Sequence, residues 1–127
     1  MKKRISMIGI ATVLAALVPL AAIAAANDAD VRRGGSCTGS TSAKIKLSPE
    51  DGGIETEFEV DQNRTGVTWK VTLRRAGKVI VRTQATTGGR SGSFEVRRVL
   101  SDGPGSDSIS ARAVSPSGEV CTASASI

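Results

Sequence analysis

Apolar and polar residues alternate one by one through several segments of this chain, and this two-residue period constrains the fold more than any other feature. Three segments show it clearly, with inward-type residues at Ala43, Ile45 and Leu47, at Ile54, Thr56, Phe58 and Val60, and at Val67, Trp69, Val71 and Leu73. Successive side chains of a β-strand point to opposite faces, so each segment forms a strand with one buried and one solvated face. No stretch after residue 26 has helical periodicity, and the sequence therefore predicts an all-β fold.

Clusters of Gly, Pro, Asn and Asp separate the strands at short intervals, and they lie at residues 49–53, 61–66, 76–78, 102–105 and 116–118. Seven short strands at this spacing, with an inward Trp69 on the third, predict a single antiparallel immunoglobulin-like or fibronectin-type sandwich. The tight turn at residues 76–78 favours the version in which the third and fourth strands share a sheet with the last two. We expect the sandwich domain over residues 37–127, after a short polar lead over residues 27–36.

The alternation also predicts how the strands pair. In the first hairpin, a turn over residues 49–53 sets Lys46 opposite Glu55 and Lys44 opposite Glu57, so that apolar parity and charge pairing agree. In the second hairpin, a three-residue loop pairs Leu73 with Val81 and Val71 with Thr83.

Strict alternation breaks in the fifth predicted strand, because Arg98 falls on the inward side and Val99 on the outward side. A β-bulge at Arg97 and Arg98 would restore the pattern and bring Val99 inside. We therefore expect a bulge there.

The first 26 residues have the layout of a secretory signal peptide. Lys2, Lys3 and Arg4 give a positive start, an apolar run covers residues 7–26, and small residues precede Asn27. We expect cleavage between Ala26 and Asn27 and a secreted protein. The alternative is an uncleaved N-terminal membrane anchor, since about 20 apolar residues can span a bilayer.

Two cysteines, Cys37 and Cys121, remain in the predicted mature chain. Outside the cell a pair of cysteines forms a disulfide far more readily than it persists as free thiols. Here the bridge would tie the start of the first predicted strand to the last strand. A domain of about 100 residues with only three aromatic side chains gains from such a cross-link.

Four stretches carry a resemblance: 31–37 (VRRGGSC), 44–49 (KIKLSP), 58–64 (FEVDQNR) and 68–73 (TWKVTL). With the terminal Cys121, they resemble a family of small secreted actinobacterial proteins that share this Cys, Trp and Cys framework. The resemblance implies an immunoglobulin-like sandwich with one disulfide, and it implies no activity.

The residue inventory argues against an enzyme. The chain has no histidine, which removes the Ser-His-Asp and Cys-His arrangements and most zinc sites. Glu55, Glu57 and Glu59 lie on the outward face of one strand, as a solvated hairpin requires. The stretch from Asp61 begins like a calcium loop, but Thr72 stands where the bidentate glutamate belongs. We expect no catalytic residue, no metal and no cofactor.

One uneven charge distribution remains. Three of the 17 basic residues belong to the predicted signal peptide, so the mature chain has 14 basic and 12 acidic residues, a net charge of +2. Even so, Lys70, Arg74, Arg82 and Arg112 share the outward face of one predicted sheet, with no acid on its central strands. This face is either an ordinary solubilising surface or an electrostatic dock for an anionic envelope polymer or a partner protein.

The sequence therefore predicts a secreted, non-catalytic binding or structural module. Inward parity of all three aromatic residues leaves none to stack on bases or sugars, which argues against nucleic acid as a partner. Three alternatives are a small-molecule carrier, a hydrolase inhibitor that presents the loop between Thr86 and Ser93, and an enzyme, although the residue inventory argues against the last.

Overall fold

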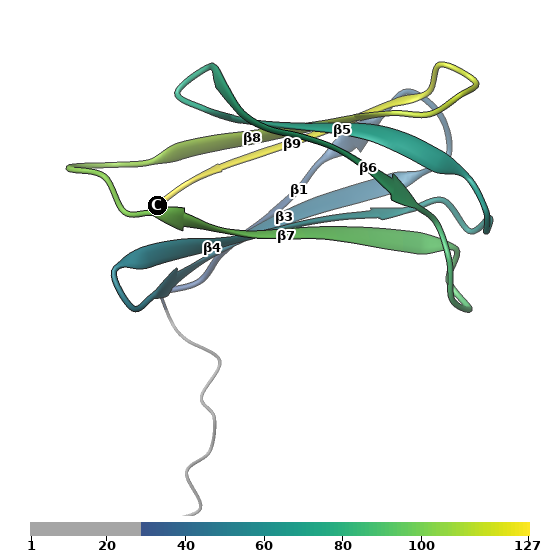
Figure 1. Ribbon diagram of the computed structural model, residues 1–127. Coiled ribbons are helices and arrows are strands. Elements are labelled where there is room, and N and C mark those ends of the chain that lie inside the picture. The colour runs from purple at the N-terminus through teal and green to yellow at the C-terminus, as the bar shows by residue number, and fades with distance from the viewer. Residues whose placement is uncertain (1–28) are drawn as a thin grey trace, which may run out of the picture.

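The computed structural model describes residues 29–127, and the predicted signal peptide and cleavage site lie outside the described residues. Within them the chain forms nine strands and no helix (Figure 1). The strands are β1 (Val31–Gly34), β2 (Ser36–Cys37), β3 (Ser42–Glu50), β4 (Gly53–Asp61), β5 (Thr68–Arg75), β6 (Lys78–Thr86), β7 (Ser93–Ser101), β8 (Ser108–Val114) and β9 (Val120–Ser126). The described residues contain no helix long and apolar enough to cross a membrane.

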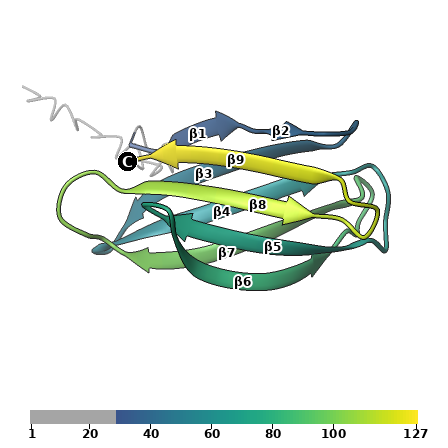
Figure 2. The ribbon, with the colours of Figure 1, turned by 90° about the horizontal axis from the view of Figure 1, so that it is seen from above.

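The strands form two antiparallel sheets that pack face to face (Figures 1 and 2). Sheet A has the order β1-β3-β4-β7, and sheet B has the order β2-β9-β8-β5-β6. The predicted all-β sandwich is confirmed. The strands predicted as third and fourth, β5 and β6, do share a sheet with the last two, β8 and β9.

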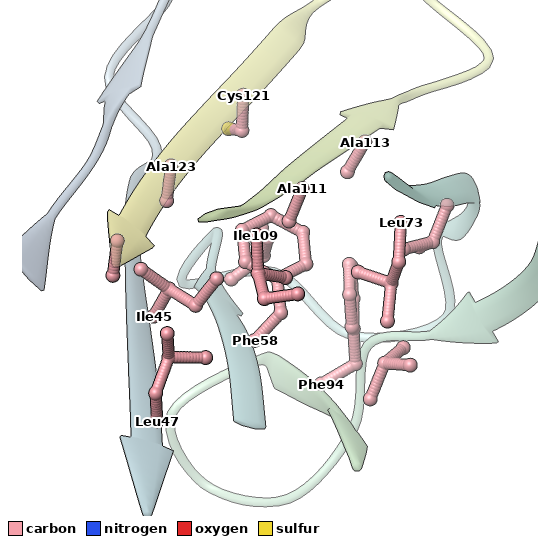
Figure 3. Packing of buried hydrophobic residues seen from close by; sticks show 14 of the residues in the cluster. Ile45, Leu47, Phe58, Leu73, Phe94, Ile109, Ala111, Ala113, Cys121 and Ala123 are labelled. Carbon is pink, nitrogen blue, oxygen red and sulfur yellow. The ribbon is translucent and has the colours of Figure 1, made fainter. Parts of the chain in front are cut away.

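The inner faces of the two sheets are filled by side chains (Figure 3). Trp69 and Phe58 are fully buried at 0% exposure, and Phe94 packs against both rings with centroid distances of 6.2 and 6.4 Å. The Trp69 Nε1–H donates a hydrogen bond to Gln62 Oε1 at 3.1 Å, so the polar end of the indole is also satisfied. Small residues on β8 and β9, including Ala111 and Ala123, make room for these rings.

The structure has nine strands rather than the predicted seven, because the residues that lead up to Cys37 form two further strands, β1 and β2. The predicted polar lead contains β1, which pairs with β3 in sheet A, and the chain then crosses to sheet B as β2 beside β9. Gly35 lies at the crossing, where a Cβ atom would collide with the Thr122 carbonyl oxygen and the Ala123 side chain. Only glycine allows this close approach, so the crossing depends on Gly35.

The first hairpin is shifted by two residues from the predicted register. Lys44 lies opposite Glu59 and Lys46 opposite Glu57, so the predicted pairing with Glu55 is wrong. The physical reason is the turn, which contains only Asp51 and Gly52, with φ values of 34° and 76°. An Asp-Gly pair favours this two-residue turn, which extends β3 by Pro49 and Glu50 and β4 by Gly53 relative to the predicted five-residue turn.

The second hairpin has the predicted register, with Leu73 opposite Val81 and Val71 opposite Thr83. Its loop is nevertheless shorter than predicted, because Ala76 and Gly77 alone form the turn, with φ values of 48° and 79°. A bulge beside Leu73, which leaves Ile80 without a partner, restores the inward parity.

The bulge predicted in β7 is wrong. All nine residues of β7 pair in continuous register with β4, which sets Arg98 opposite the buried Thr56 and leaves Val99 64% exposed on the outer face. β7 is the edge strand of sheet A, so an inward-facing arginine can still reach solvent there. The Arg98 guanidinium donates to the Arg97 carbonyl oxygen at 2.7 Å.

The predicted disulfide is present between Cys37 and Cys121. The two residues are directly opposite each other on β2 and β9, with their Cα atoms 4.0 Å apart. The bridge therefore closes most of the described chain by joining neighbouring strands of sheet B.

Candidate functional site

Three outward carboxylates of β4 are engaged in ion pairs. Lys46 Nζ lies 3.1 Å from Glu57, Lys44 Nζ lies 3.7 Å from Glu59, and Arg97 Nη2 donates to Glu55 Oε2 at 2.6 Å. The hydrogen bond from Arg97 is the main reason why the pKa of Glu55 is lowered to about 2. A general acid needs a carboxyl group that holds its proton near neutral pH, and Glu55 is ionised there.

Two other groups of potential ligand atoms have structural roles. Cys37, Cys121 and Glu119 lie together, but the two sulfur atoms are bonded to each other and Glu119 accepts a hydrogen bond from the Thr41 backbone N–H. In the calcium-like loop, Asp61 Oδ1 accepts the Asn63 N–H at 3.1 Å and so stabilises the turn.

The loop between Thr86 and Ser93 is fixed at both ends. Thr87 is buried, and its backbone exchanges hydrogen bonds with Gly66 and Val67. Gly88 and Ser93 form two backbone hydrogen bonds with each other, at 2.9 and 3.1 Å, and close a tight turn. Only the tip of this loop, at residues 89–91, is exposed.

Charge is distributed unequally between the two sheets. The strands of sheet A carry six basic and six acidic residues, whereas those of sheet B carry six basic residues and no acidic one. Sheet B is therefore the source of the positive field of the described domain.

The structure brings the four predicted basic residues together around one threonine, Thr72. On β5, Lys70 and Arg74 lie two residues before and two residues after Thr72; on the neighbouring strands, Arg112 of β8 and Arg82 of β6 lie directly opposite it. Strands are about 4.8 Å apart and residues i and i+2 about 6.8 Å apart, so each of the four Cα atoms lies within about 7 Å of that of Thr72. We call these five residues the basic face.

The cations of the basic face have no carboxylate partner. Among residues 29–127, none of the four makes an ion pair or a side-chain hydrogen bond, and the hydroxyl of Thr72 makes none either. On the inner side of the same strand, Trp69, Val71 and Leu73 are buried, which holds the backbone of β5 in place. A rigid surface therefore presents four uncompensated positive charges to solvent.

Two shallow depressions lie next to each other on this outer surface and share Arg112. The first is lined by Lys70, Thr72, Arg82, Gln84, Arg112 and Val114. The second is lined mainly by hydroxyl groups, together with two arginines and backbone: Ser36, Ser110, Thr122, Ser124, Arg74 and Arg112. A third depression, on sheet A, is lined by charges of both signs, including the Lys46–Glu57 pair.

Sequence reasoning identified the four cations but missed Thr72 and the hydroxyl-lined depression beside them. Outward parity was visible for Thr72, Ser110 and Ser124, but their positions next to the cations depend on which strands are neighbours. The sequence signal that could have indicated this depression is the row of outward serines and threonines on the last two strands.

Comparisons of the chain with protein-family models, with curated proteins and with solved structures give no match. The functional argument therefore rests on the geometry and charge of the chain itself.

Proposed function

We propose that this chain is a secreted, disulfide-stabilised binding module that uses its basic face to dock on an anionic polymer of the cell envelope or the surrounding medium. It catalyses no reaction and needs no cofactor. In this proposal the sandwich is of the immunoglobulin-like type, and the chain belongs with the small secreted actinobacterial proteins that it resembles.

The observation that carries the proposal is the contrast between the two sheets. On sheet A, the outward lysines lie opposite glutamates and pair with them, whereas the outward cations of sheet B have no partner among the described residues. Four like charges around one threonine repel one another, and an anion bound between them removes that repulsion. A solubilising surface needs no such clustering, because charges of both signs serve that purpose.

Secretion follows from the predicted signal peptide. The Cys37–Cys121 bridge supports it, since disulfides persist in oxidising compartments and are rare in the cytosol. A protein held at the cell surface meets polyanions at high local concentration, where long-range attraction raises the rate of encounter.

The carrier and the inhibitor have less support from the geometry. A carrier of this size would hold its ligand in a cleft between loops, and the depression between the loops at residues 62–67 and 116–117 is shallow and open to solvent. A protease inhibitor presents an extended segment to the cleft of the enzyme, whereas the loop between Thr86 and Ser93 closes into a turn.

The test is retention of the secreted protein on cell walls from its own host, at low salt and at 1 M salt. Screening shortens the reach of surface charges to about 3 Å at 1 M, so we expect high salt to abolish binding. A basic residue near an anionic surface contributes about 1 kcal/mol, so the Lys70→Gln/Arg74→Gln/Arg112→Gln variant should bind roughly 100-fold more weakly.

The matched control is Arg64→Gln/Lys78→Gln/Arg90→Gln, which removes the same charge from exposed positions outside the basic face. It should retain most of the binding, and both variants should unfold within about 0.5 kcal/mol of the wild type. Equal binding by the two variants would refute the proposal. Binding that survives 1 M salt would instead indicate a specific partner protein.

A further inference from the structure

The outer surface of sheet B continues from the basic face into a regular array of hydroxyl groups. Ser110 of β8 lies opposite Ser124 of β9, and Ser36 of β2 lies opposite Thr122 of β9. None of these four hydroxyls makes a side-chain hydrogen bond within the part of the chain that the structure describes. Their donors and acceptors are free for a ligand.

One row of residues crosses both parts of this surface. It runs from Arg82 on β6 through Thr72 on β5, Arg112 on β8 and Thr122 on β9 to Ser36 on β2. Ser110 lies two residues from Arg112 along β8, so its Cα is about 8 Å from that of Thr72, and Arg112 is a neighbour of both. Figure 2 views the sandwich from this side, with β9, β8, β5 and β6 next to one another.

The two depressions have complementary chemistry. The one around Thr72 offers three cations, a threonine hydroxyl and the amide of Gln84, which suits a phosphate group that can only accept hydrogen bonds. The one around Ser110 and Ser124 offers hydroxyls that both donate and accept, as the hydroxyls of a polyol do.

The positions of the aromatic residues restrict the class of ligand further. Trp69, Phe58 and Phe94 are all buried, so this surface has no ring on which a base or a sugar ring could stack. An open-chain polyol needs no stacking partner.

From these observations we propose that the outer surface of sheet B binds a polymer in which phosphodiesters alternate with open-chain polyol units. A phosphate lies over Thr72, the next polyol lies over Ser110 and Ser124, and Arg112 contacts both. This inference deepens the proposed function and rests on it, since it specifies which anionic polymer the basic face recognises.

The experiment compares the affinity of the secreted protein for poly(glycerol phosphate) with its affinity for inorganic polyphosphate of equal phosphate number and for poly-glutamate. Polyphosphate has the higher charge density, so electrostatics alone would favour it. We expect the reverse order, with poly(glycerol phosphate) bound about tenfold more tightly, because its hydrogen bonds to Ser110, Ser124 and the neighbouring hydroxyls outweigh the electrostatic advantage of polyphosphate.

The Ser110→Ala/Ser124→Ala variant should lose this tenfold preference and keep its affinity for polyphosphate. The matched control, Ser108→Ala/Ser126→Ala, removes the neighbouring hydroxyl pair on the same two strands, outside both depressions, and should keep the preference.

Equal or tighter binding of polyphosphate, with no effect of Ser110→Ala/Ser124→Ala, would overturn the inference; salt-sensitive polyphosphate binding would then leave the proposed function standing. Poly-glutamate bound as tightly as poly(glycerol phosphate) would also overturn it, because a carboxylate polymer would then suffice. Failure to bind any of the three polymers, together with failure to bind cell walls, would refute the proposed function as well.

Discussion

Removal of the Cys37–Cys121 bridge should destabilise the domain by several kcal/mol. The two cysteines are 84 residues apart in the sequence, so the bridge closes a loop that includes most of the described chain. In the chain-entropy description a loop of this length contributes about 4.5 kcal/mol at 25 °C, because it restricts the unfolded state. A domain of this size has a total free energy of unfolding of about 5–15 kcal/mol.

The position of the bridge adds a local effect. β2 has two residues, and it is held to β9 by the pairs Ser36–Thr122 and Cys37–Cys121 and by two hydrogen bonds between the adjoining Thr38 and Val120. Without the bridge, so short an edge strand should fray from sheet B before the sandwich unfolds. Part of the loss will then appear as faster hydrogen exchange at residues 36–38 and at β9, and the global loss falls below 4.5 kcal/mol.

The assay is urea unfolding of the oxidised protein, the reduced protein and the Cys37→Ala/Cys121→Ala variant. With a slope of about 1–3 kcal/mol per molar urea, a loss of about 4 kcal/mol lowers the midpoint by roughly 2 M. The reduced protein is the control, because it keeps both side chains and lacks only the covalent bond. A loss of less than 1 kcal/mol in both forms would refute the argument from loop closure.

Three further predictions concern the packing and the charges of the sandwich. Gly35→Ala should cost about 2 kcal/mol in urea unfolding, because its Cβ meets the Thr122 backbone, whereas Gly34→Ala, with open space around it, should cost less than 1 kcal/mol. Arg97 lowers the folded-state pKa of Glu55, and Arg75 lowers that of Asp107. The free energy of unfolding should therefore be at its full value above about pH 4.5 and decline toward pH 2. A urea midpoint that stays constant from pH 7 to pH 2 would contradict this. Val99→Thr should change the free energy of unfolding by no more than about 0.5 kcal/mol, since Val99 is 64% exposed. A loss above about 1.5 kcal/mol would show that Val99 is buried.

The errors in strand pairing have a common physical origin. A shift of two residues along a strand leaves every side chain on its own face, so alternation cannot distinguish the predicted pairing of Lys46 with Glu55 from the observed pairing with Glu57. The charge pattern could not decide either, because Glu55, Glu57 and Glu59 repeat at the same period. The length of the Asp51-Gly52 turn determines the register of the hairpin.

The error at Arg98 and Val99 has a different cause. The predicted bulge assumed that every inward position of a strand is closed to water, which holds for a central strand. β7 is an edge strand, so Arg98 faces inward and still reaches solvent, and Val99 stays outside without a bulge. Position in the sheet is a long-range property that the local pattern does not contain.

β1 and β2 were missed for the same reason. Residues 31–37 have two glycines, two arginines and no alternation, so nothing local marks them as strands. They are strands because β3 and β9 offer free edges with which their backbone groups pair.

Local pattern by itself determined the strand class, the face on which each central side chain lies, the inward parity of Trp69 and the outward parity of each of the four cations. Each of these properties follows from the two-residue period of a strand or from residue type, and none of them depends on distant parts of the chain. Only the tertiary structure decided which strands are neighbours, and thereby set Arg82 and Arg112 on either side of Thr72 and the free hydroxyls beside Arg112. The candidate site is a set of cross-strand neighbours, and neighbours across strands are chosen by turns, edges and packing between the sheets.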